Sequence, residues 1–549
     1  MGLKTFCEVV LERQGDPNPA ILFEGESWTY DEYLKACCER AALLLSTRLD
    51  GPLHVGVLLD NVPEFPIWLG AVAIAGGVLV GINPTRRGAG LAHDIRHTDC
   101  QLIITEGEYL PLLEGLDVGV GEDRILNIDS QAYRDLIAQH AGAGVPDVEI
   151  APEQTLLLLF TSGTSGAPKA VICTQKKLGL VATATAAMAR LAPGSVSYQA
   201  MPMFHSNALF TALAPCVAAG ATSALRRKFS ASGFIEDVRK FGATYFNYVG
   251  KPLSYILATP ERPDDADNTL TFVFGNEAAD LDLERFSKRF AVKVVDGYGS
   301  TETGAAVSRT KDMPRGALGR ASEGTKILDS ETGEPCAVAQ FDEQGLLTNP
   351  EEAIGEIVNT RDQGLFEGYY NNEEANAARV RDGMFWTGDL AYVDADGFFY
   401  FAGRDFEWLR VDGENFAAAP VERILDRFQG IVLNAVYAVP DAETGDQVMA
   451  ALQLAEPSSF DAETFERFLE AQSDLGTKWS PRYVRLSTAL PTTQTSKIQK
   501  KLLRSERWEC DEPVYFRPKK GDPLRPMTKD DVDALRAEFE ARGRTSVLI

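Results

Sequence analysis

Thr161-Ser-Gly-Thr-Ser-Gly-Ala-Pro-Lys169 carries most of the information about the fold, because it puts two glycines, four hydroxyl side chains and a lysine into one short loop. The apolar run Leu156–Phe160 immediately before it predicts a buried strand. Glycine lets backbone N–H groups approach an anion, and hydroxyl groups and a lysine can hold phosphate oxygens. The loop differs from a P-loop, because Pro168 precedes the lysine and no Ser or Thr follows it. It therefore predicts a polyphosphate site; a flexible surface linker, the alternative, would need no preceding buried strand.

Strand-like and helix-like segments alternate along the chain. Val55–Leu59 and Val292–Val295 are short apolar runs, whereas Tyr30–Thr47 is a longer amphipathic stretch. This alternation is typical of βαβ units and predicts an α/β fold with mostly parallel sheets. Because parallel sheets bind ligands at the carboxyl ends of their strands, the Thr161 loop lies where a ligand site is expected.

The length of 549 residues is too great for one hydrophobic core and predicts at least two domains. We expect a boundary that divides the chain into residues 1–403 and residues 404–549. In the second unit, Pro420–Leu425 predicts a helix that opens with proline, and Ile431–Val439 predicts a strand. The size of this unit is normal for a small domain.

The formal net charge of −25 argues against nucleic acid as a partner and against electrostatic attachment to anionic lipid. Both kinds of binding need clustered Lys and Arg. Anionic ligands would then require locally focused positive charge, for which the candidates are Lys169, Arg404, Arg410 and Lys497.

Cysteine usage and hydropathy indicate the compartment. Eight scattered cysteines without a C-x-x-C pair favour reduced thiols and a cytoplasmic location. Phe65–Ile82 has 18 residues without a charge, which reaches the length of a membrane span, but it contains Pro66 and the pair Gly76-Gly77. We therefore expect a buried helix that ends near Gly76, then the strand Val78–Ile82, and no integral membrane span.

Three further segments follow the Thr161 loop: Asp296-Gly-Tyr-Gly-Ser-Thr-Glu302, then Trp386-Thr-Gly-Asp389 with Gly403-Arg404, and finally Pro491-Thr-Thr-Gln-Thr-Ser-Lys497-Ile. In this order they resemble the adenylate-forming superfamily of acyl-CoA synthetases, luciferases and peptide-synthetase adenylation domains. The resemblance runs from about Phe23 to about Leu503. It implies a large N-terminal domain of mostly parallel sheets with helices and a β subdomain, and a small mobile α+β C-terminal domain that carries a catalytic lysine.

The resemblance also implies a reaction in two halves. A carboxylate attacks the α-phosphorus of MgATP to give an acyl-adenylate and pyrophosphate, and a thiol, usually that of coenzyme A, then displaces AMP. Because the first half brings an anion against a polyanion, the site must neutralise charge and fix the attacking geometry. The expected ligands are a small-molecule carboxylic acid, ATP with Mg²⁺, and coenzyme A.

The matched motifs imply roles for individual residues. Glu302 is expected to bind Mg²⁺, a hard cation that prefers oxygen ligands, and Thr301 to donate to the α-phosphate. Lys497 completes the expected catalytic set, with its ammonium where negative charge develops in the transition state. The first loop is expected to hold the β- and γ-phosphates through Thr161, Ser162, Gly163, Thr164, Ser165, Gly166 and Lys169.

The resemblance places the nucleoside against other residues. Tyr298 is expected to stack on adenine, and Asp389 to accept both ribose hydroxyls. Arg404 would contact ribose or phosphate. The alternatives are that Tyr298 is a buried core residue, that Asp389 only forms a turn, and that Arg404 belongs to a structural ion pair. The other face of adenine is expected to be lined by Gly275, Asn276, Glu277 and Ala278.

The C-terminal unit has its own expected positions. Lys500 and Lys501 compete with Lys497 for the catalytic assignment, but Lys497 precedes Ile and follows a Pro-Thr-rich loop. Relatives mostly carry Gly before this lysine, where this chain has Ser496. Because the small domain rotates between the half-reactions in this superfamily, residues 410–415 are expected to help form the thiol tunnel. Two of them, Arg410 and Gly413, are expected at the coenzyme A site, and the hinge is expected at Phe406.

The acyl pocket is predicted around His205, which resembles a histidine that borders this pocket in relatives; a satisfied core histidine is the alternative. Its walls are expected to include Phe204, Phe246, Tyr248 and Val249. His93 and His97 have the i, i+4 spacing of zinc-binding helices, but no third ligand is apparent.

Three stretches, at residues 226–233, 248–253 and 408–416, resemble the fatty-acid-transport-protein and very-long-chain acyl-CoA synthetase branch, particularly its actinobacterial members. That branch implies a bulky apolar acid, either a long or very-long-chain fatty acid or a steroid side-chain or bile acid. Two other functions stay open: an acyl-AMP ligase that loads a carrier protein, and a non-catalytic lipid-binding or transport protein of the same fold. Peripheral membrane contact and a homodimer also stay open.

Overall fold

The computed structural model describes most of the chain. Its described residues are 4–161, 168–278, 280–310, 312–314, 316–342, 347–404, 408–411, 414–442, 446–456, 460–472, 475–476, 478–493, 497–519 and 521–548. Within these ranges, none of the helices combines the length and the apolar character that crossing a membrane would require.

The first large sheet has the strand order β6-β5-β3-β4-β7-β8, and every neighbouring pair except β7–β8 is parallel. Because β7 runs parallel to β4, the loop that starts at Thr161 leaves from the carboxyl end of a parallel strand, as predicted. Strand β8 comes next among the described strands and pairs antiparallel with β7. The strands are β3 (His54–Leu58), β4 (Val78–Gly81), β5 (Cys100–Thr105), β6 (Ile125–Asn127), β7 (Thr155–Thr161) and β8 (Lys169–Thr174).

The second large sheet has the order β13-β12-β11-β9-β10-β1-β2, and only its edge pair β1–β2 is antiparallel. The predicted α/β class with mostly parallel sheets is therefore confirmed. The strands are β1 (Pro19–Phe23), β2 (Glu26–Thr29), β9 (Val196–Gln199), β10 (Thr222–Leu225), β11 (Tyr245–Val249), β12 (Phe272–Asn276) and β13 (Lys293–Asp296).

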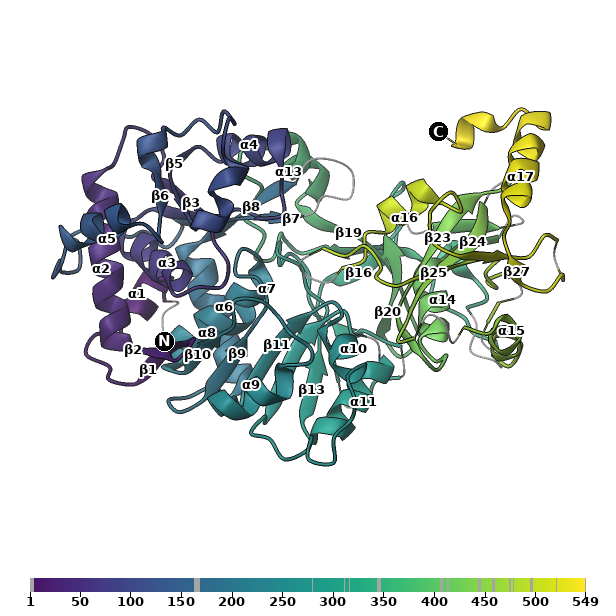
Figure 1. Cartoon of the computed structure of the whole chain (residues 1–549), viewed down its shortest axis with the longest axis horizontal. Helices are drawn as coiled ribbons and strands as arrows, with labels where there is room; N and C mark the ends of the chain where they lie inside the picture. Colours follow the sequence, from purple (N-terminus) through teal and green to yellow (C-terminus); the bar gives the residue numbers. More distant parts are fainter. Residues whose placement is uncertain are drawn as a thin grey trace.

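The main core joins these two sheets through helices that lie between them (Figure 1). Helix α3 (Glu64–Ala75) is buried along its whole length after Glu64, which is why its sequence is apolar on every side. It ends at Gly76, whose left-handed φ of 68° closes the helix before β4 begins at Val78. The uncharged stretch is thus a buried helix and a strand, as expected. Helices α1 (Phe6–Leu11) and α2 (Tyr30–Ser46) pack against α3, and α1 also packs against α6 (Gln175–Ala189) and α8 (Ala214–Ala219).

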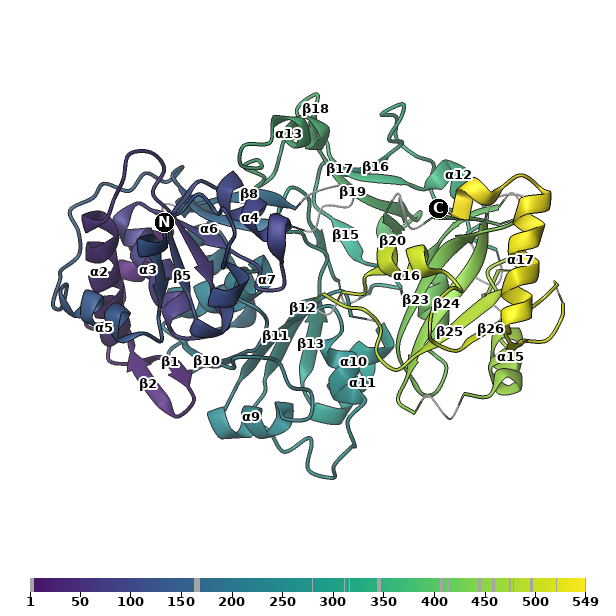
Figure 2. The same cartoon turned by 45° about the horizontal axis from the view of Figure 1, so that its top comes forward.

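A third, mainly antiparallel sheet follows in the chain and lies between the large sheets and the C-terminal part (Figure 2). Its order is β14-β15-β20-β19-β17-β16, with β18 on the edge of β19. The strands are β14 (Val307–Ser308), β15 (Gly319–Ala321), β16 (Thr325–Leu328), β17 (Gly355–Asn359), β18 (Val380–Arg381), β19 (Met384–Val393) and β20 (Phe398–Arg404).

The C-terminal part contains the hairpin β21 (Trp408–Val411) and β22 (Glu414–Ala417), and a five-stranded sheet. This sheet has its own apolar clusters, and Tyr255 from the large part packs against one of them. The predicted helix and strand at residues 420–425 and 431–439 are present as α14 (Ala418–Leu425) and β23 (Ile431–Pro440). The other strands are β24 (Asp446–Leu454), β25 (Tyr483–Ser487), β26 (Val514–Phe516) and β27 (Arg525–Pro526).

The remaining helices cover the sheets and connect them. In the large part they are α4 (Gly88–His97), α5 (Gln131–Ala138), α7 (Ser206–Ala208), the π-helix η3 (Leu209–Leu213), α9 (Phe234–Phe241), α10 (Pro252–Leu257), α11 (Asp280–Phe290), α12 (Pro350–Ala353) and α13 (Glu373–Arg379). In the C-terminal part they are α15 (Ala462–Glu470), α16 (Lys500–Glu506) and α17 (Lys529–Ala541). Short 3₁₀ turns lie at Gly107–Leu112, Glu122–Arg124 and Thr545–Leu548.

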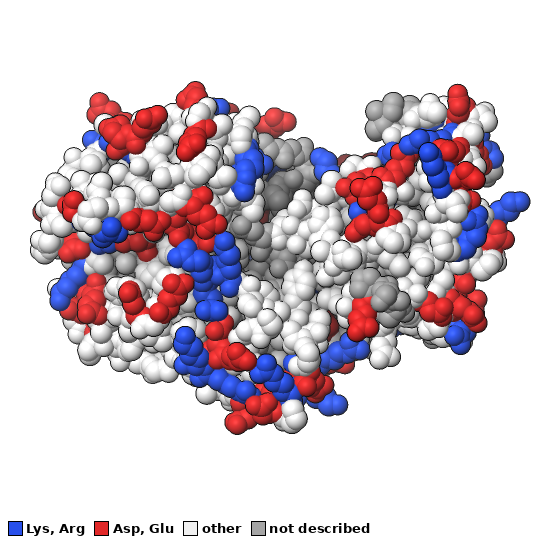
Figure 3. Space-filling view, viewed as in Figure 1, with Lys and Arg blue, Asp and Glu red and all other residues white. Residues whose placement is uncertain are grey.

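The surface separates charged regions from uncharged ones (Figure 3). On the face shown, Lys and Arg are interspersed with Asp and Glu, while the described residues visible between the large part and the C-terminal part are largely uncharged.

Candidate active site

Two neighbouring parallel strands, β12 and β13, end side by side and begin the site. Gly275 is paired with Asp296, and the Asn276 amide donates to the carbonyl of Gly297 at 2.5 Å. Glu277 then turns the chain with a left-handed φ of 71°. The four residues predicted along adenine therefore lie against the start of the Asp296–Glu302 motif.

Asp296 is buried beneath this edge. Its carboxylate accepts hydrogen bonds from the Tyr248 hydroxyl at 2.7 Å and from the backbone N–H of Ala278 at 3.2 Å. Burial raises the pKa of Asp296 to about 7, although both hydrogen bonds act in the opposite direction. In the sequence, Asp296 was only the first residue of the Asp296–Glu302 motif and had no assigned role. In the structure it links this motif to the Gly275–Ala278 segment.

Tyr298 and Asp389 meet although they come from distant segments. The Tyr298 hydroxyl donates to Oδ2 of Asp389 at 2.7 Å, and Asp389 is only 6% exposed on β19. On the next strand Arg404 is directly opposite Asp389 in the backbone register. The structure thus brings the predicted adenine and ribose positions to one place.

Glu302 is held by a residue that sequence reasoning missed. The Tyr369 hydroxyl donates to Oε1 of Glu302 at 2.9 Å, and the Arg379 guanidinium donates to the same hydroxyl at 3.2 Å. The Lys169 ammonium lies 5.3 Å from the centre of the Tyr369 ring, a cation–π contact. The only sequence signal was an aromatic pair, Tyr369-Tyr370, before a helix.

Lys169 and Thr301 are two of the residues predicted to contact phosphate. Burial, followed by the nearby Arg379 charge, lowers the pKa of Lys169. The Thr301 hydroxyl shares a 2.7 Å hydrogen bond with that of Ser206, the first residue of α7. Thr161 lies at the end of β7, while the predicted Ser162, Gly163, Thr164, Ser165 and Gly166 lie outside the described residues.

Lys497 reaches the site from the C-terminal part. Its Nζ lies 2.6 Å from Oε1 of Glu277, and its backbone N–H donates to the Thr493 hydroxyl at 3.2 Å. Burial and the positive charge of Lys497 lower the pKa of His205 to about 3, so this imidazole is neutral near pH 7. Lys497, Glu277 and His205 are therefore near neighbours.

The predicted acyl-pocket residues occupy different surroundings. The Phe204 ring lies 4.2 Å from the His205 ring. Phe246 is fully buried and packs on the rings of Tyr198 and Phe234, and Tyr248 is fully buried with its hydroxyl on Asp296. Val249 ends β11 and is 8% exposed.

Asn207 is a further polar residue near this region. Its amide donates to the carbonyl of Tyr248 at 3.1 Å, and its side-chain oxygen accepts from Asn247 at 2.8 Å. These contacts tie α7, which follows His205, to strand β11. Nothing in the sequence pattern singled out Asn207.

For the predicted nucleotide residue Arg404 and the predicted coenzyme A residue Arg410, the structure describes the backbone. The backbones of Arg404 and Arg410 lie in β20 and β21, and Gly413 lies outside the described residues, as does the predicted hinge Phe406.

Metal-binding groups made of protein side chains alone are absent from the described part of the chain: no three His, Cys, Asp or Glu residues gather in a suitable cluster. His93 and His97 stack with ring centres 5.5 Å apart, and Nε2 of His97 lies 3.0 Å from the carbonyl of Tyr370. Within the described residues, this pair has a structural partner and no further ligand.

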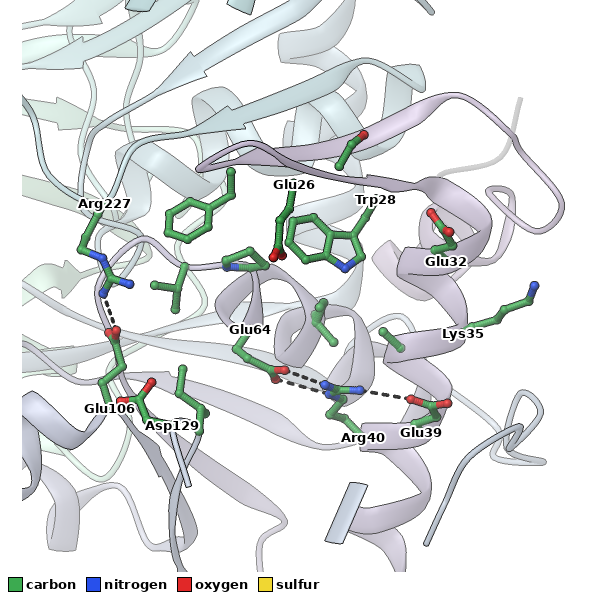
Figure 4. Close-up of a pocket in the computed structure, with 17 residues that line it drawn as sticks. Glu26, Trp28, Glu32, Lys35, Glu39, Arg40, Glu64, Glu106, Asp129 and Arg227 are labelled. Carbon is green, nitrogen blue, oxygen red and sulfur yellow. Dashed lines mark hydrogen bonds and ion pairs between the residues drawn. The ribbon is translucent and has the colours of Figure 1, made fainter. Parts of the chain in front are cut away.

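A separate cavity of about 690 Å³ lies between β2, α2 and the start of α3 (Figure 4). None of the predicted site residues lines it. Its inner carboxylates already have partners: Glu64 pairs with Arg40 at 2.5 Å, and Glu106 pairs with Arg227. We therefore do not identify it with the nucleotide site.

Comparison with known proteins gives consistent matches. A protein family described as AMP-binding enzyme matches residues 7–370. Steroid-22-oyl-CoA synthetase of Rhodococcus jostii is 49% identical over 547 residues, covering 99% of both chains. The medium/long-chain-fatty-acid–CoA ligase FadD17 of Mycobacterium marinum is 48% identical over 476 residues, covering 86% of this chain and 91% of its own.

Solved structures share the fold at lower identity. ATP-bound MatB from Rhodopseudomonas palustris matches with a TM-score of 0.79 and 22% identity, over 92% of this chain and 98% of that one. The anthranilate CoA ligase AuaEII in complex with anthranoyl-AMP gives the same TM-score and coverage at 20% identity.

Proposed function

The chain belongs to the AMP-binding enzyme family, and from that premise we propose that it converts a bulky apolar carboxylic acid into its coenzyme A thioester. First, a carboxylate oxygen of the acid forms a bond to the α-phosphorus of ATP, and the bond from that phosphorus to pyrophosphate breaks. Then the sulfur of coenzyme A attacks the acyl carbon, AMP leaves, and the thiol proton is released. Acid, ATP and coenzyme A are the substrates.

One observation carries the proposal more than any other: the Lys497 ammonium lies 2.6 Å from Glu277, in the segment proposed to line adenine. An ammonium at this edge can approach the α-phosphate of a bound nucleotide and the carboxylate that attacks it. Negative charge builds up there in the transition state, and a fixed positive charge lowers the barrier. The neutral His205 beside it adds no second positive charge.

The nucleoside would lie between the Gly275–Ala278 segment and Tyr298, with its ribose on Asp389. Tyr298 and Asp389 support this role because a 2.7 Å hydrogen bond joins them, although they come from distant segments. A carboxylate with two acceptor oxygens can accept from ribose hydroxyls while it keeps the Tyr298 bond.

Glu302 fits a magnesium ion that arrives with the nucleotide. Mg²⁺ is usually bound by one or two carboxylates together with substrate phosphates and waters, so a cage of protein ligands is not required. Glu302 is 9% exposed and is oriented by Tyr369. When bound, the ion would neutralise phosphate charge; we propose Glu302 as its protein ligand.

The acid itself is proposed to be a fatty acid or a steroid side-chain acid, in line with the names of the two relatives that share almost half of the sequence. Burial of such an acid would supply affinity at ~0.8 kcal/mol per CH₂ group. His205 stays proposed as a residue that borders the acyl pocket, and Phe204, Phe246, Tyr248 and Val249 stay proposed as its walls.

The test is an ATP–pyrophosphate exchange screen over fatty, aromatic, bile and steroid acids, followed by AMP release on addition of coenzyme A. Exchange with an apolar acid and coenzyme A-dependent release support the proposal. Exchange without such release would favour transfer to a carrier protein. A complete lack of exchange with every acid would favour the non-catalytic lipid-binding alternative.

We also propose that residues 404–549 form the small mobile domain and that the enzyme works in the cytoplasm. The C-terminal sheet and its own apolar clusters support the first proposal. All eight cysteines carry free thiols and six of them are buried, which supports a reducing compartment.

A further inference from the structure

Lys177 is a buried lysine that none of the roles above uses. It lies in the first turn of α6, directly after β8, and its side chain is 1% exposed. A buried ammonium is costly unless hydrogen bonds and opposite charge compensate it. Its partners should therefore explain why the fold keeps it.

The partners of Lys177 are the backbone of the catalytic segment. Its Nζ donates to the carbonyl of Thr301 at 3.4 Å and to the carbonyl of Glu302 at 3.3 Å. These two consecutive residues carry the hydroxyl and the carboxylate proposed to contact the α-phosphate and Mg²⁺. One ammonium therefore holds the backbone on which both groups depend.

The segment needs such a constraint. Thr303 has a left-handed φ of 55°, a conformation that β-branched residues rarely adopt and that persists only where the surroundings enforce it. The Thr303 hydroxyl donates to the Glu302 carbonyl at 2.7 Å, so this oxygen accepts from both Thr303 and Lys177. The Glu302 carboxylate is fixed separately by Tyr369.

The base of α6 is fixed as well. The Thr174 hydroxyl accepts from the backbone N–H of Lys177 at 3.2 Å and donates to Oε1 of Glu367 at 2.6 Å, while Oε2 of Glu367 accepts from the Thr174 N–H at 2.8 Å. The ammonium of Lys177 thus extends from a rigid helix start. It connects the helix start that follows β8, the strand that begins with Lys169, to the segment that carries Glu302.

We propose that Lys177 is a positioning residue: its ammonium holds the Thr301–Glu302 backbone so that the hydroxyl and carboxylate meet the magnesium nucleotide in the reactive arrangement. This inference rests on the proposed function for its kinetic effect, but nucleotide binding can test it separately. Because the Lys177 side chain is 1% exposed and its ammonium donates to the Thr301 and Glu302 carbonyls, it would act through these two residues.

The experiment compares Lys177→Met, which keeps the apolar stem, with Lys177→Arg, which keeps a cationic donor. The matched control is Lys176→Met, because Lys176 is the neighbouring residue, is 38% exposed and has only a 3.7 Å contact with Glu153. Each protein is measured for melting temperature, for kcat and KM in ATP–pyrophosphate exchange, and for ATP binding with Mg²⁺ and with EDTA.

We expect Lys177→Met to lower kcat of exchange by roughly 10- to 100-fold, in the range of misplaced catalytic groups. The KM for the acid should stay within about threefold of that of the unmodified enzyme, because the acyl pocket is untouched. The gain in ATP affinity on adding Mg²⁺ should shrink, and Lys177→Arg should recover most of kcat. Lys176→Met should match the unmodified enzyme.

A Lys177→Met protein with a lowered melting temperature, an unchanged kcat and an unchanged Mg²⁺ effect would overturn the proposal and leave Lys177 as a packing residue. If Lys177→Met does not fold, Lys177→Gln decides: a folded protein with reduced kcat and a reduced Mg²⁺ effect supports the role, and one with normal values overturns it. If no acid supports exchange, the proposed function fails, while the Mg²⁺ effect on ATP binding still decides the role of Lys177.

Discussion

The Lys497 ammonium and the Glu277 carboxylate meet at 2.6 Å and thereby join the C-terminal part to the large part, at the segment that follows β12. The two side chains are 38% and 46% exposed, so the pair contributes only ~0–1 kcal/mol to stability. We propose that the value of the pair is positional, because it would keep the Lys497 ammonium near the place where adenylate formation is proposed to need a positive charge. A bound nucleotide would offer that cation a more highly charged partner.

Replacement of Lys497 should separate the two half-reactions. Lys497→Ala should lower acyl-adenylate formation by on the order of 10²–10³-fold, as found when a group that stabilises transition-state charge is removed. Transfer to coenzyme A from a supplied acyl-adenylate should change far less. Single-turnover measurement of each half tests this, with Lys501→Ala, at an exposed position on α16, as the control. An equal loss in both halves would show that Lys497 does not act specifically in adenylate formation.

The Tyr298–Asp389 pair should control the affinity for ATP. Asp389→Asn should raise the KM for ATP by roughly 10- to 100-fold, because hydrogen bonds to a charged group are lost. Tyr298→Phe keeps the ring and removes one hydrogen bond, so a rise of only ~2- to 10-fold is expected. ATP titration of the exchange rate measures both. If neither variant changes the KM for ATP, the ribose site must lie elsewhere.

Gly275 should tolerate no side chain. A Cβ at this position would lie 2.5 Å from both the ring and the carbonyl oxygen of Tyr248, and neither can move freely in the core. Gly275→Ala should therefore destabilise the protein by ~1–3 kcal/mol, the usual range for overpacking. Thermal melting tests this against Gly144→Ala, where a Cβ would meet nothing within 4 Å. Matching melting temperatures for these two variants would contradict the packing argument.

Asp296 should make stability depend on pH. Its folded-state pKa of about 7 lies above the ordinary value of 3.8, so the folded state binds one more proton between these limits. Its contribution to stability is fully present below the ordinary value and is lost as the pH rises through the folded one. Asp296→Asn lacks this titration. The melting temperature of the unmodified protein should therefore fall, relative to that of Asp296→Asn, as the pH rises across that range. A difference in melting temperature that stays constant with pH would count against the raised pKa.

Much of the fold could be predicted because local patterns and packing agree. The run Leu156–Phe160 lies in strand β7, and the uncharged stretch from Phe65 begins as a buried helix that ends at Gly76. For the site, motif order brought Tyr298, Asp389 and Lys497 into consideration before any geometry was known. Those patterns lie within single segments.

Long-range side-chain partners could not be predicted in the same way. Tyr369 and Lys177 contact Glu302 only after separate strands and helices pack, and neither has a distinctive neighbourhood in the sequence. Phe246 shows a related limit: its ring contacts Tyr198 and Phe234, a surrounding that depends on how α9 covers the sheet. The alternation of inward and outward side chains along β11 does not by itself reveal which rings surround Phe246.

Tyr255 of α10 packs among apolar residues of the C-terminal sheet. A fragment that stops after β20 would leave this aromatic ring facing water, together with the rest of the surface that the sheet covers. Such a fragment should therefore tend to aggregate in solution. Exchanging C-terminal parts between related proteins would require the Tyr255 ring and its new surroundings to be matched in shape.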